Sequence, residues 1–102
     1  MKRVEAFFQF GKLEGVVEAV ENAGVGGLTV FYARGRGPAE REKIHTTRGT
    51  KLEEQFYNLI DCIVTIVEDD QVEKVIDAIR KNANSTSKGI ITISDVSKIV
   101  KI

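Results

Sequence analysis

Residues 59–67 read LIDCIVTIV and form the strongest strand signal in the chain. The run is almost continuously apolar, as expected for a central strand buried on both faces of a sheet. Acidic residues follow at positions 68–70, where Asp69 or Asp70 is expected to cap a helix by accepting from its first free amides. The apolar positions then repeat at helical spacing, at Val72, Val75, Ile76 and Ile79.

A second strand–helix–strand unit precedes this one. Residues 3–10 alternate, with Val4, Ala6 and Phe8 on one apolar face, and so predict a strand. The helical spacing that starts at residue 12 ends at Gly24, a residue suited to a helix C-terminus. The β-branched and aromatic run at 28–33 predicts the next strand.

Past the second helix, residues 90–94 predict a further strand. The tail, 96–102, alternates apolar and polar residues and predicts either an additional C-terminal edge strand or a contact with a neighbouring copy.

The order of these elements predicts an α+β, ferredoxin-like βαββαβ domain over residues 1–102. Its sheet is expected to have four antiparallel strands, with two helices on one face. Alternate strand residues such as Phe7, Phe31 and Ile63 are expected on the other face. Since a monomer would leave these apolar side chains in water, the pattern favours self-association through the sheet.

Composition excludes several classes of protein. The 102 residues carry 15 Lys and Arg against 15 Asp and Glu, which argues against a general nucleic-acid binder and against a polybasic membrane anchor. No apolar run reaches the roughly 18 residues of a membrane span, and no secretory leader is visible, so a cytoplasmic protein is expected. Cys62 is expected to be a buried thiol, and it cannot form a zinc site with His45 alone.

Nothing in the sequence supports an enzyme. Phosphate-loop, dinucleotide-binding, zinc-protease and nucleophile-elbow motifs are missing. The charged segment 34–54, by contrast, is long for a connection in so small a domain, and loops of this length are usually functional or disordered.

Residues 23–30 read AGVGGLTV, and residues 34–37 read RGRG. Both motifs resemble the PII nitrogen-regulatory signal-transduction family: the first is similar to a signature of that family, and the second to the opening of its T-loop. Acidic residues at 68–70 stand where the family has Pro-Asp-Asp, and residues 89–102 resemble its last strand and C-terminal segment. The order and spacing of these motifs match from one end of the chain to the other.

The resemblance implies a homotrimer that binds an adenine nucleotide in clefts between subunits. The T-loop, here 36–54, would then act on a membrane transporter or metabolic enzyme. By resemblance, residues of the effector cleft would be Gly27, Leu28, Thr29, Gly35, Arg36, Gly37, Ile66, Lys88, Gly89 and Lys101. Those of the partner-binding loop would be Arg41, Lys43, His45, Arg48 and Lys51. No metal site and no nucleic-acid partner are implied.

The chain departs from the family in its ligand loops. The phosphate-binding B-loop, here 84–89, is about two residues shorter, and Ile90 stands at its lysine position. Leu59 and Ile60 occupy the region of the lysine that holds 2-oxoglutarate, and no tyrosine stands at the modified T-loop position. The effector therefore stays open among ADP, AMP, ATP and a cyclic nucleotide. Two alternatives are a trimeric adaptor that has lost nucleotide binding and a metal-binding ferredoxin-like trimer.

Overall fold

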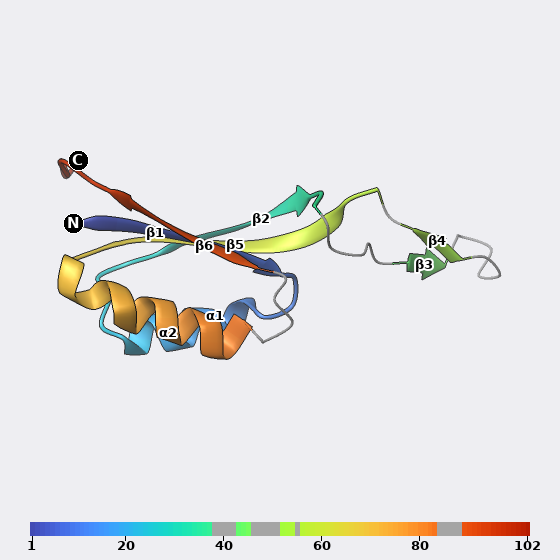
Figure 1. Ribbon diagram of the computed structural model, residues 1–102, viewed down its shortest axis with the longest axis horizontal. Helices are drawn as coiled ribbons and strands as arrows, with labels where there is room; N and C mark the ends of the chain where they lie inside the picture. The colour runs from blue at the N-terminus through green and yellow to red at the C-terminus, as the bar shows by residue number, and fades with distance from the viewer. Residues whose placement is uncertain (38–42, 46–51, 55, 84–88) are drawn as a thin grey trace.

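The computed structural model describes residues 1–37, 43–45, 52–54, 56–83 and 89–102 (Figure 1). Its main sheet contains β1 (Lys2–Gln9), β2 (Thr29–Gly35), β5 (Asn58–Val67) and β6 (Ile90–Asp95), in the order β2-β5-β1-β6. Every neighbouring pair is antiparallel. Helices α1 (Leu13–Asn22) and α2 (Val72–Ala83) lie together under one face of this sheet (Figure 1). The predicted ferredoxin-like arrangement is confirmed.

The core lies between the helices and one face of the two central strands. Val4, Ala6 and Phe8 point from β1 toward the helices, as the alternation predicted. Ile63 and Val67 join them from β5, and the helices add Val16, Val20, Val75 and Ile79. The prediction for Ile63 was therefore wrong: this residue is 1% exposed and belongs to the helix-covered face. A continuously apolar strand carries no alternation that would reveal which face a given residue takes.

The helix-free face is here called the open face, and a row of four residues crosses its centre. Phe31 pairs with Cys62, Cys62 with Phe7, and Phe7 with Ile90, so one residue from each strand lies in this row. Phe31 and Ile90 are exposed, 44% and 59%, whereas Cys62 is fully buried. The predicted apolar face therefore exists, with Cys62 in place of Ile63.

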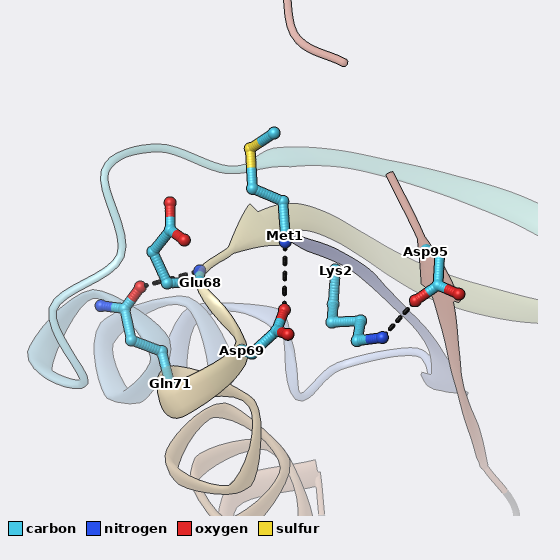
Figure 2. A network of polar contacts seen from close by, with 6 residues as sticks. All are labelled: Met1, Lys2, Glu68, Asp69, Gln71 and Asp95. Atoms are coloured by element: carbon cyan, nitrogen blue, oxygen red, sulfur yellow. Dashed lines mark hydrogen bonds and ion pairs between the residues drawn. The ribbon is translucent and has the colours of Figure 1, made fainter. Parts of the chain in front are cut away.

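Helix ends follow the local sequence only in part. Gly24 ends α1 with φ +90° and donates to the carbonyl of Glu21 at 3.0 Å, as predicted for a terminal glycine. The second helix begins differently, because a 3₁₀ turn, η1 (Asp69–Gln71), precedes α2 and Glu68 is its N-cap. The Gln71 side chain accepts from the Glu68 N–H at 3.2 Å (Figure 2).

The predicted capping role of the Asp69 carboxylate is not observed. This carboxylate instead contacts the amino group of Met1 at 3.0 Å, and Lys2 pairs with Asp95 beside it (Figure 2). These two ion pairs join the first residues of β1 to η1 and to the end of β6.

Two further segments differ from expectation. Residues 96–102 form no strand, although Val96 N–H donates to the Met1 carbonyl at 3.1 Å and so continues the path of β6. The long segment 36–54 contains an unpredicted antiparallel pair, β3 (Lys43–His45) with β4 (Leu52–Glu54). Strands of three residues give too short a pattern to be detected in sequence.

Candidate functional site

The first group of predicted effector residues lies where β2 begins. Thr29 is the first residue of β2 and pairs with Val64, and Ile66 lies two residues further along β5. The buried Thr65 hydroxyl donates to the carbonyl of Gly27 at 2.6 Å, which ties the glycine-rich segment before β2 to the central strand.

A second bond holds this glycine-rich segment at its other end. The amide of Gln71 donates to the Gly24 carbonyl at 3.1 Å, so η1 and the segment after α1 are linked. The backbone around Gly27 is thereby fixed between β5 and η1. At Gly27 itself, no atom beyond its chain neighbours lies within 4 Å of the position a Cβ would take, so a larger side chain would meet open space there.

The second group lies at the opposite end of β2. Gly35 is the last residue of the strand and pairs with Asn58, and Arg36 and Gly37 follow directly. A Cβ at Gly35 would overlap the Ile60 Cδ1 atom, so the glycine lets this side chain pack over the strand end. Gly37 has open space around it.

Two arginine–aromatic contacts stand beside these glycines. The guanidinium carbon of Arg36 lies 3.8 Å from the ring centroid of Phe56, and that of Arg34 lies 5.5 Å from the ring centroid of Tyr57. The two rings contact each other edge to face, 4.7 Å between centroids. The arrangement joins the segment before residue 38 to the segment after residue 55.

Gly89 lies at the other edge of the sheet, immediately before β6. A Cβ at this position would lie 2.8 Å from the Phe7 carbonyl oxygen and 3.3 Å from the Phe8 Cβ. Gly89 is therefore required for close approach to β1, whatever its role toward a ligand. Since β2 and β6 are the two edge strands, Gly89 is separated from the β2 glycines by β5 and β1.

The predicted effector residues thus divide into two groups. The β2-start group contains Gly27, Leu28, Thr29 and Ile66, together with Lys101, whose segment leaves the sheet from the same end after Asp95 pairs with Lys2. The β2-end group contains Gly35, Arg36 and Gly37, with Gly89 across the sheet. A seven-residue strand separates the two ends of β2, a span of about 20 Å at roughly 3.3 Å per residue.

Several predicted residues stay untested by this geometry. Lys88, Arg41, Arg48 and Lys51 lie outside the described residues. Lys43 and His45 fall on β3, of which the structure gives the backbone pairing. Sequence reasoning missed the contacts of Arg34 with Tyr57 and of Arg36 with Phe56, which no motif or spacing in the sequence indicates.

Two titratable groups, Asp61 and Cys62, lie in the sheet interior. The carboxylate of Asp61 is buried and accepts from the Gly11 N–H at 2.9 Å. Burial raises the pKa of the Cys62 thiol, and the nearby Asp61 and Glu5 charges raise it further. The described residues contain no group of three His, Cys, Asp or Glu side chains able to hold a metal ion. Neither of the described helices has the length and apolar character that a membrane span needs.

Comparison with known proteins gives one consistent answer. The family model described as Nitrogen regulatory protein P-II matches residues 1–102. A Nitrogen regulatory protein P-II of Mesorhizobium japonicum is 38% identical over 106 aligned positions, which cover all of this chain and 91% of that protein. Proteins of the same description from Rhizobium meliloti and Microchaete diplosiphon are each 36% identical, with the same coverage. The chain therefore belongs to the nitrogen regulatory protein P-II family.

Proposed function

We propose that this P-II family regulator is a homotrimer whose effector, an adenine nucleotide, binds between subunits. Its segment 36–54 would then contact a target protein, a membrane transporter or a metabolic enzyme. The observation that carries the proposal is the separation of the two groups of effector residues. Because the β2-start and β2-end groups lie at opposite ends of β2, one chain cannot place both around a single nucleotide.

Neighbouring subunits would remove this separation. In a ring of identical subunits, the β2-start group of one chain meets the β2-end group of the next, and three such contacts give three equivalent clefts. The glycines of both groups would let backbone N–H groups approach the ligand. Lys101 would supply a charge from the C-terminal segment.

The open face supports the same assembly. It presents Phe31, Ile90 and Ile66 to solvent in a single chain, whereas Cys62, between Phe31 and Phe7 in the central row, is buried. Covering this face in a trimer removes apolar surface from water, worth about 25 cal/mol for each Å². The exposed apolar side chains of the tail, Ile99 and Val100, offer further contacts to a neighbour.

Ligand binding would act on the target through a population shift. Residues 36–54 begin at the β2-end group, so a ligand that contacts Gly35 and Gly37 makes different contacts in different conformations of that segment. The conformation in which the ligand makes the better contacts is stabilised, and the target protein binds one conformation of the segment more tightly than the other.

Calorimetric titration of the purified protein with ATP, ADP, AMP and cyclic AMP tests the proposal, combined with light scattering for oligomeric state. Phe31→Glu places a charge on the open face, and Lys74→Glu on the exposed surface of α2 is its matched control. We expect one nucleotide per subunit in the wild type and in Lys74→Glu, and neither trimer nor binding in Phe31→Glu. Binding by a monomer would contradict the shared cleft, and a trimer without nucleotide binding would favour the adaptor.

A further inference from the structure

The root of the C-terminal segment carries a connected group of polar residues, here called the terminal network: Met1, Lys2, Asp69, Gln71 and Asp95 (Figure 2). The Met1 amino group contacts the Asp69 carboxylate at 3.0 Å, and Lys2 pairs with Asp95. The Met1 carbonyl accepts from the Val96 N–H at 3.1 Å. The start of β1 is thereby tied both to η1 and to the first residue after β6.

The two ion pairs of the terminal network influence each other. The pKa of Lys2 is raised by its hydrogen bond and charge contact with Asp95 and, to a smaller extent, by the Asp69 charge. The pKa of Asp95 is lowered by the hydrogen bond and charge of Lys2 and, to a smaller extent, by the charge of the N-terminal amino group. Two cations and two carboxylates therefore attract one another as one cluster, and such a network contributes more than an isolated exposed pair does.

The 3₁₀ turn η1 connects this cluster with the glycine-rich segment before β2. Its first residue, Asp69, contacts Met1, and its last residue, Gln71, donates from the side-chain amide to the Gly24 carbonyl at 3.1 Å. One turn therefore holds both parts of the β2-start group. These parts are the residues that lead into β2 and the root of the segment that ends in Lys101 and Ile102.

The C-terminal segment depends on this root for its direction. Residues 97–102 are exposed in the single chain, and in Figure 1 they leave the end of β6 on the side away from the helices. Lys101 is five residues beyond Val96, so the two residues can lie at most about 18 Å apart. A loosely held root would let Lys101 sample this whole range, whereas a fixed root raises its effective concentration in one direction.

We propose that Asp69 and Asp95 are positioning residues for Lys101. Through their contacts with Met1 and Lys2, they direct the C-terminal segment toward the effector cleft shared with the adjacent subunit. The inference rests on the proposed function and deepens it, because it assigns how the charge of Lys101 is brought to the ligand. Neither aspartate touches the ligand, and each acts through the root of the segment. A merely structural role would change stability and leave the contribution of Lys101 to binding unchanged.

Hydrogen exchange of residues 96–102, followed by mass spectrometry without nucleotide, measures how firmly the root is held. The test variants are Asp69→Asn and Asp95→Asn, and each removes one ion pair at nearly constant side-chain size. The matched control is Asp70→Asn, the same change at the next exposed residue of η1, since none of the ion pairs in the described part of the chain involves Asp70. We expect faster exchange of residues 96–102 in both test variants and wild-type exchange in the control. Light scattering and thermal unfolding confirm that each variant keeps the wild-type assembly and fold.

Calorimetric titrations with ATP, ADP, AMP and cyclic AMP separate positioning from structure when they are repeated in chains that carry Lys101→Ala. With Lys101 present, we expect each test variant to weaken the nucleotides that the wild type binds by about two- to fivefold, the factor that corresponds to an exposed ion pair. With Lys101→Ala, the same substitutions should leave nucleotide affinity unchanged, because the side chain that they position is absent. Asp70→Asn should match its parent chain in both backgrounds.

The outcomes keep this inference apart from the function on which it rests. Wild-type nucleotide affinity in both test variants would overturn the positioning role and leave the proposed function standing, and so would a loss of affinity that persists in Lys101→Ala. Wild-type exchange of residues 96–102 in both test variants would likewise overturn it, since the root would then be held by other contacts. A wild type that binds none of the four nucleotides would overturn both the inference and the proposed function.

Discussion

Gly89→Ala is expected to destabilise the protein through a clash with β1. The added Cβ would lie 2.8 Å from the Phe7 carbonyl oxygen and 3.3 Å from the Phe8 Cβ. β1 is paired on both sides, with β5 and with β6, so its backbone cannot retreat without disturbing a ladder. Overpacking of this kind costs about 1–3 kcal/mol of unfolding free energy.

The matched control is Gly27→Ala, the corresponding change in the β2-start group. No atom lies within 4 Å of its Cβ position, and its φ is not in the left-handed region. A compatible glycine-to-alanine change stabilises by about 0.4–1 kcal/mol because it restricts the unfolded chain. The two variants are thus expected to change stability in opposite directions.

Thermal unfolding followed by circular dichroism measures both variants, without ligand and at one protein concentration, since assembly makes the midpoint concentration-dependent. For a domain of about 100 residues, 1 kcal/mol shifts the midpoint by about 4–8 °C. We expect Gly89→Ala to unfold at least several degrees below the wild type and Gly27→Ala at or slightly above it. A Gly89→Ala midpoint equal to that of Gly27→Ala would refute the close approach of this residue to β1.

Three further perturbations follow from the described contacts. Thr65→Val removes the bond to the Gly27 carbonyl and should lower the free energy of unfolding by about 0.5–1.5 kcal/mol in urea titrations, together with nucleotide affinity. The hydrogen bond and charge of Lys2 hold the pKa of Asp95 below its ordinary 3.8, so the pair's contribution to stability is present above that pH and is lost as pH falls through the folded-state pKa. The stabilities of Asp95→Asn and of the wild type should therefore converge at low pH. Equal stability of the two proteins at neutral pH would contradict a contribution from this pair. Because burial raises the pKa of Cys62, iodoacetamide should label it only after the sheet opens, and rapid labelling of the native protein at pH 8 would contradict its burial.

Much of the fold follows from periodicity. The alternation at Val4, Ala6 and Phe8 and the helical spacing in both helices gave the correct elements and the correct helix-covered face of β1. The same reasoning failed for Ile63, since an uninterrupted apolar strand fits the sheet in either register. The prediction that Asp69 caps the helix was wrong because its carboxylate contacts the Met1 amino group. Rules for helix capping, which use only neighbouring residues, do not describe such a contact between distant segments.

The sequence indicated which residues belong to the candidate site, but it did not indicate how they are arranged in space. The strand predicted at 28–33 already separates Gly27 from Gly35, but only the register shows which residues of β5 lie beside each group. The contact of Arg36 with Phe56 depends on how two residues distant in sequence come together at the end of the sheet. Side-chain stacking of this kind follows from tertiary structure and leaves no spacing in the sequence.

Native mass spectrometry with ATP tests the central claim most directly, because one spectrum counts both the chains and the bound nucleotides in each assembly. The shared-cleft account predicts three chains carrying up to three nucleotides, and no nucleotide on any residual monomer. A monomer that retains ATP would contradict the account, and so would a trimer that remains free of nucleotide at saturating concentration.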